Sequence, residues 1–149
     1  MELPSTILTK FMGDSFENEK VYLFKNKNYD KIAPAHFHIA LKTNQDEYLV
    51  LSMITSQVEK RIKYYTLTNK SLVKSVVIIN SNDIDILEKE SCIDCNEPIY
   101  GTKEEIESIA LDLEYIEAKI DKHLKNKIIK AIKLSAKVRD EIKNSLGED

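Results

Sequence analysis

Short apolar runs separated by polar turns fill the first two thirds of this chain, and longer stretches with helical spacing follow them. Apolar runs of about four to eight residues, bounded by Asn, Asp, Ser or Lys, are typical of β-strands. The strands predicted in this way span residues 20–24, 36–41, 48–53, 64–67, 76–79 and 91–95. A polar loop follows the first strand, and a helical turn is predicted at residues 58–63.

The pattern changes to a helical one after Gly101. Thr102 can cap a helix, with Glu104 and Glu105 in the first turn, near the positive end of the helix dipole. A second and longer helix is predicted after Asp121. Its apolar stripe recurs close to the helical period at Leu124, Ile128, Ile132, Ser135, Val138 and Ile142.

Strands first and helices last predict an α+β domain, most simply a small curled β-sheet or β-barrel with C-terminal helices packed on it. The chain has 149 residues, of which 42% are hydrophobic, enough for one domain with its own core. We expect a single domain over residues 1–149. It would comprise a lead-in over 1–19, a β-barrel core over 20–100 and a helical C-terminal part over 101–149.

Composition and charge narrow the class of protein. No apolar run approaches the ~20 residues that cross a bilayer, and residues 1–16 do not resemble a signal peptide. Two cysteines are too few for a disulfide framework, so we expect a cytoplasmic protein without membrane association. Residues 83–118 carry 12 acidic and two basic side chains. This imbalance argues against nucleic-acid binding over the whole surface, but a local basic patch in the first half stays open.

The third predicted strand ends on hydroxyl and amide side chains. Thr55, Ser56 and Gln57 directly follow the mostly apolar residues 48–54. Polar groups at the end of a strand lie at a sheet edge, where a substrate can contact them. A structural role is nearly as well supported, because Thr and Ser commonly end a strand or cap a helix, here one beginning near Val58.

The order of these segments resembles the PemK/MazF toxins of bacterial toxin–antitoxin pairs. The likeness covers roughly residues 20–136 and consists of the first strand, a polar loop, a second strand, residues 51–57, residues 90–96 and a C-terminal helix. It implies a small SH3-like curled β-barrel, usually dimeric. It also implies cleavage of single-stranded RNA without a metal or another cofactor, and a cognate antitoxin protein that holds the enzyme inactive.

The resemblance also implies roles for individual residues. Thr55 would contact the scissile phosphate, with Ser56 beside it. The loop over residues 25–35 lacks the glycines and the arginine that are usual in this family. His36 stands about where that arginine would be, and Lys31 is the nearest strong cation.

Metal-free RNA cleavage needs a group that activates the ribose hydroxyl, a proton for the leaving oxygen, and positive charge near the phosphate. His36 suits the acid or base role because the pKa of histidine is near neutrality. Lys31 would stabilise charge, and Thr55 would donate a hydrogen bond to the phosphate. His36 and His38 alternate along one strand, so both are expected on the same side. The residues predicted to bind the substrate are Ser56, Gln57, His38 and Asn96.

Two other functions stay open. The loop without arginine and glycine favours a non-catalytic barrel of the same fold, which would bind RNA or a protein partner. A weaker possibility is a zinc protein that uses Cys92 and Cys95 together with His36 and His38. Residues three apart on a strand face opposite sides, which favours two buried thiols and no metal.

Overall fold

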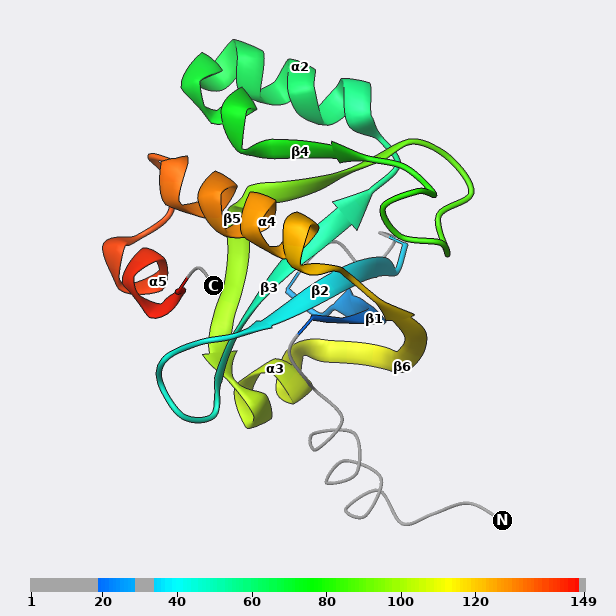
Figure 1. Ribbon diagram of the computed structural model, residues 1–149, viewed down its shortest axis with the longest axis vertical. Coiled ribbons are helices and arrows are strands. Elements are labelled where there is room, and N and C mark those ends of the chain that lie inside the picture. Colours follow the sequence, from blue (N-terminus) through cyan, green and yellow to red (C-terminus); the bar gives the residue numbers. More distant parts are fainter. Residues whose placement is uncertain (1–18, 29–33, 148–149) are drawn as a thin grey trace.

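The computed structural model describes residues 19–28 and 34–147. In it, six antiparallel strands of different lengths form one sheet (Figure 1). Hydrogen bonding sets the strand order β4-β5-β3-β2-β1-β6. Within the described residues, the end strands β4 and β6 do not pair with each other, so the sheet stays open. The strands are β1 (Lys20–Asn26), β2 (His36–Lys42), β3 (Tyr48–Thr55), β4 (Val76–Ile79), β5 (Ser91–Thr102) and β6 (Ala110–Lys119).

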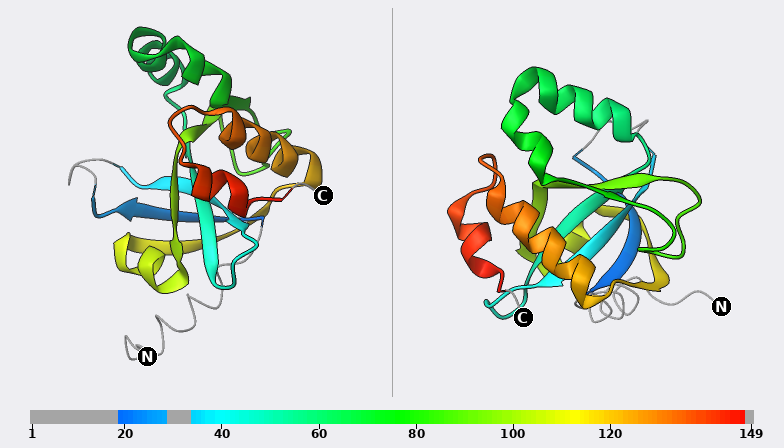
Figure 2. Two further views of the ribbon diagram at one scale, coloured as in Figure 1. Left: turned by 90° about the vertical axis from the view of Figure 1, so that its left-hand side faces the viewer. Right: turned by 45° about the horizontal axis from the view of Figure 1, so that its top comes forward.

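Most of the helices lie at one end of the sheet and over one of its faces, whereas the short helix over Lys103–Ile109 packs on the other face (Figures 1 and 2). Helix α2 and the 3-10 helix η1 follow β3 and lie beside β4, whereas α4 crosses the sheet near β5. No helix among the described residues is long and apolar enough to span a membrane. The helices are α2 (Val58–Thr68), η1 (Lys70–Ser75), α3 (Lys103–Ile109), α4 (Lys122–Leu134) and α5 (Asp140–Ser145).

Buried side chains gather on both faces of the sheet. The larger cluster joins alternate residues of the strands, such as Val21 and Ile39, to Ile128 of α4 and Ile142 of α5. The smaller cluster lies on the opposite face, because the next residues along the strands point the other way. Its members are Tyr22, Phe24, Ala40, Leu49, Leu51 and Ile106.

The helix starts predicted at Thr102 and Asp121 are confirmed. The Thr102 hydroxyl accepts a hydrogen bond from the Glu105 backbone N–H at 3.2 Å, and the Glu105 carboxylate accepts one from the Thr102 N–H at 3.1 Å. This reciprocal pair is a capping box, and it starts α3. The Asp121 carboxylate accepts a hydrogen bond from the Leu124 N–H at 2.8 Å and starts α4.

The sequence interpretation was wrong in three places. Residues 64–67 belong to α2 rather than to a strand, since helical geometry turns Tyr65 into the interior. The part predicted as helical after residue 100 contains β6, which pairs with β1 along its length. The predicted long helix is broken after Leu134, where the Ser135 hydroxyl donates a hydrogen bond to the Asn96 side chain at 2.7 Å.

The coarse fold class is as predicted, with a mixed α+β architecture and the C-terminal helices α4 and α5 packed on the sheet. Closure into a barrel is not confirmed, because the end strands of the described sheet are unpaired with each other. The lead-in predicted over residues 1–19 lies, except for Glu19, outside the described residues.

Candidate functional site

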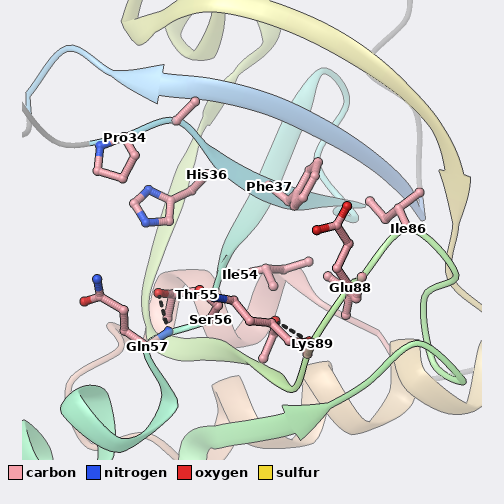
Figure 3. A pocket seen from close by; sticks show the side chains of 13 residues that line it. Pro34, His36, Phe37, Ile54, Thr55, Ser56, Gln57, Ile86, Glu88 and Lys89 are labelled. Carbon is pink, nitrogen blue, oxygen red and sulfur yellow. Dashed lines mark hydrogen bonds between the residues drawn. The ribbon is translucent and has the colours of Figure 1, made fainter.

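A pocket of about 470 Å³ opens where β2 begins and β3 ends (Figure 3). The loop that precedes β5 forms its other wall. In Figure 3 the His36 ring, Thr55 and Gln57 lie on one side, and Ile86 and Glu88 lie on the other. The lining residues are Pro34, Ala35, His36, Phe37, Ile54, Thr55, Ser56, Gln57, Ile86, Leu87, Glu88, Lys89 and Ser91. Four of the predicted site residues therefore come together here.

His36 and Thr55 face each other across two neighbouring strands. The register that pairs Phe37 of β2 with Ile54 of β3 sets His36 opposite Thr55. Burial lowers the pKa of His36 below its ordinary value of 6.5, and the positive charge of Arg61 lowers it further. A histidine with a lowered pKa is neutral near pH 7, so its ring can accept a proton.

The Thr55 hydroxyl takes part in the turn that follows β3. The hydroxyl accepts a hydrogen bond from the Gln57 backbone N–H at 3.2 Å. Gln57 itself occupies the N-cap position of α2, and its side chain makes no capping hydrogen bond. Within the described residues, the Thr55 hydroxyl is found only as an acceptor, which leaves its proton to donate to a ligand. Ser56 and Gln57 are exposed beside it.

His38 lies in the protein interior rather than at the pocket. Its ring stacks on Phe24 with centroids 3.8 Å apart, and its Nδ1 lies 2.9 Å from the His36 backbone oxygen. Only 1% of the residue is exposed, and burial lowers its pKa to about 3. His38 and His36 share a face of the sheet as predicted, but a substrate-binding role for His38 finds no support in this geometry.

Asn96 is also placed away from the pocket. Its amide nitrogen donates a hydrogen bond to the Leu72 backbone oxygen at 2.9 Å, and its amide oxygen accepts one from the Ser135 hydroxyl. The side chain therefore ties η1 and the end of α4 to β5, and it is 1% exposed. These contacts are structural and do not match the predicted role in substrate binding. Lys31 lies outside the described residues.

A buried carboxylate with a tyrosine and an arginine was not predicted from the sequence. The Tyr65 hydroxyl donates to Asp94 Oδ2 at 2.7 Å, and Arg61 Nη1 lies 3.4 Å from the same oxygen. The Asn96 backbone N–H donates to Asp94 Oδ1 at 3.0 Å. Arg61 and Tyr65 share a helix face because they are four residues apart. Reading residues 64–67 as a strand hid that spacing.

The two cysteines are buried and free. Burial raises the pKa of Cys92 to about 11, and it raises that of Cys95 further. Thiols held in this protonated state are poor nucleophiles and poor metal ligands. Over residues 19–28 and 34–147, no group of three or more His, Cys, Asp or Glu side chains is arranged to hold a metal ion.

A scan against protein-family models and a search of the curated proteins find no match to this chain. The likeness to the PemK/MazF toxins thus rests on the order of the sequence segments, and it stays a prediction. Function has to be argued from the pocket and from the residues around it.

Proposed function

We propose that this chain is the toxin of a type II toxin–antitoxin pair, a metal-independent endoribonuclease that cleaves single-stranded RNA. One observation carries the proposal: His36 and Thr55 face each other on the wall of an open pocket, with the charge of Arg61 nearby. A proton acceptor, a hydroxyl donor and a cation are the groups that cleavage of a phosphodiester by its own ribose requires.

The reaction can be written with these groups alone. Neutral His36 takes the proton from the ribose 2′-hydroxyl, and the 2′-oxygen then attacks the phosphorus. The bond from phosphorus to the 5′-oxygen breaks, and that oxygen leaves with the proton that His36 took from the 2′-hydroxyl, which returns His36 to its neutral form. The products are a 2′,3′-cyclic phosphate and a 5′-hydroxyl. Thr55 donates a hydrogen bond to a non-bridging oxygen as negative charge grows there. In this proposal Lys31 adds positive charge from the preceding loop.

The rest of the proposal follows from the resemblance. The curled, open sheet with helices on it is compatible with an SH3-like barrel whose closure is incomplete. Within the described residues, the end strands β4 and β6 are each paired on one side only, which gives the fold edges that a homodimer would cover. We expect a cytoplasmic protein with a cognate antitoxin, and an acidic or amphipathic segment of that antitoxin would compete with RNA for the pocket.

A non-catalytic relative that binds RNA or a protein partner is the second candidate. The loop over residues 25–35 has neither glycine nor arginine, and the pocket wall includes the carboxylate of Glu88. A negative charge at the wall weakens the attraction of a phosphate, so it argues against cleavage and, within this candidate, favours a protein partner over RNA.

Cleavage of a long single-stranded RNA in the presence of a chelator tests the proposal. We expect the native chain to cut the RNA and His36→Gln to cut it about 1,000-fold more slowly, because a general base typically contributes this much. His123→Gln is the matched control, since His123 is exposed on the first turn of α4. If the native chain leaves the RNA intact, the non-catalytic candidate takes its place. Equal rates for the two variants would remove His36 from the site.

A further inference from the structure

Arg61 follows closely after three residues that line the pocket. It lies in the first turn of α2, and its backbone N–H donates to the Gln57 carbonyl at 3.1 Å. Thr55, Ser56 and Gln57 come directly before that turn. The helix therefore fixes the start of the Arg61 side chain close to the hydroxyl that faces His36.

Asp94 holds the guanidinium over the same face of the sheet. Met53 of β3 pairs with Asp94 of β5, and Thr55 follows Met53 by two residues, so both Thr55 and Asp94 project from one face. The Asp94 side chain is 2% exposed, whereas that of Arg61 is 29% exposed. A carboxylate buried this deeply needs hydrogen bonds and a counter-charge, and Tyr65 and Arg61 supply both.

The pair with Asp94 leaves Arg61 able to bind a second anion. A guanidinium has five N–H donors, and within the described residues Asp94 is its one ion-pair partner, through Nη1 at 3.4 Å. The planar fork of arginine fits two oxygens of a phosphate. The charge of Arg61 is also felt at His36, whose pKa it lowers.

We infer that Arg61 is the phosphate-binding cation of this site, and that Asp94 and Tyr65 are the positioning residues that hold it. The inference rests on the proposed function and deepens it. Arg61 is not among the residues that line the pocket. The scissile phosphate must therefore sit at the end of the pocket next to His36 and Thr55, where a guanidinium anchored on Asp94 can reach it.

Two assays on the full chain test this inference with Arg61→Gln and the control Lys63→Gln. Lys63 is an exposed cation on the same helix. Cleavage of single-stranded RNA with chelator should fall about 100-fold for Arg61→Gln, the usual effect of losing a charge-stabilising donor. Lys63→Gln should stay within about threefold of native. The second assay measures binding of an uncleavable 2′-deoxy oligonucleotide by fluorescence anisotropy, which should weaken about tenfold for Arg61→Gln alone.

The outcomes separate the inference from the proposed function. Native cleavage with equal rates for both variants overturns the inference and leaves the function standing. No native cleavage, but oligonucleotide binding that depends on Arg61, overturns the function and supports an anion site at Arg61. If neither variant changes the binding of the oligonucleotide, that result alone overturns the inference. Should Arg61→Gln fail to fold, Arg61→Lys decides, because it keeps the charge and loses the fork. A loss of cleavage of about tenfold supports the inference, and native rates overturn it.

The titration of His36 measures whether the charge of Arg61 lies close enough to share a phosphate with it. Removing a positive charge near His36 should raise its pKa towards 6.5. NMR of the His36 ring in Arg61→Gln should show this rise, and Lys63→Gln should show none. An unchanged pKa in both variants would place the guanidinium too far from His36 to share a phosphate with it.

Discussion

The strand end around His36 and the small core around His38 differ far more than their two-residue separation implies. Both side chains project from the same face of β2. His36 lines an open pocket opposite Thr55, whereas His38 is stacked on Phe24 and 1% exposed. The imidazole of His36 is therefore accessible for proton transfer, whereas burial keeps the imidazole of His38 neutral. Neighbouring elements, rather than residue type or spacing, decide which role each one has.

Removing the Thr55 hydroxyl, which faces His36, should have the largest effect of the changes considered for these two regions. Thr55→Val keeps the shape of the side chain and removes its donor, so we expect RNA cleavage to fall about 100-fold. Thr55→Ser restores a hydroxyl and should stay within about tenfold of native. Single-turnover cleavage rates measure both. Native activity in Thr55→Val would mean that the pocket wall at Thr55 takes no part in the reaction.

Lowering the pH should destabilise the folded protein through His38. The pKa of His38 is lowered to about 3, while an unfolded chain has the ordinary value of 6.5. Above about pH 6.5 both states are neutral at this group. Below it, the unfolded chain binds a proton that the folded protein does not, so stability falls as the pH drops from 6.5 towards 3. At about pH 5 this costs about 2 kcal/mol.

Urea unfolding at about pH 7 and pH 5 checks the effect. His38→Phe keeps a flat ring against Phe24 and removes the titrating group. We expect this variant to lose about 2 kcal/mol less than the native chain between the two pH values, whatever the other groups contribute. An equal loss in both proteins would show that His38 is protonated in the folded state as easily as in the unfolded one.

Removing the N-cap of α4, which does not line the pocket, should have the smallest effect. It should lower stability without changing cleavage. Asp121→Ala removes the side-chain acceptor of the Leu124 N–H at the start of α4. We expect a loss of about 1 kcal/mol in unfolding free energy, with cleavage rates unchanged in the folded fraction. Asp121→Asn keeps an acceptor and should lose less. A drop in cleavage for the folded Asp121→Ala protein would mean that α4 affects the pocket through the buried cluster that it shares with Ile54 and Leu87.

Local patterns were enough to predict much of the fold. The strands around Val21, Ile39 and Val50 and the helix starts at Thr102 and Asp121 follow from apolar runs and capping residues. Strand β6 was missed although it has a strand pattern, in which Leu111, Leu113 and Tyr115 alternate with Asp112 and Glu114.

The candidate site was only partly predictable, because long-range contacts place some of its residues. Residues adjacent in sequence, such as Thr55, Ser56 and Gln57, were placed together correctly, and His36 joins them through the register of β2 and β3. Asn96 has a structural role because its side-chain amide forms hydrogen bonds with Leu72 and Ser135, which are far away in the chain. No local pattern reports such partners.

The ends of the cut RNA test the central claim most directly. A long single-stranded RNA is incubated with the native chain and a chelator, with His36→Gln in parallel, and the product termini are read by mass spectrometry. Attack by the ribose hydroxyl through His36 predicts 2′,3′-cyclic phosphate and 5′-hydroxyl ends, formed about 1,000-fold more slowly by His36→Gln. Fragments with 3′-hydroxyl and 5′-phosphate ends, or no cleavage by the native chain, would contradict it.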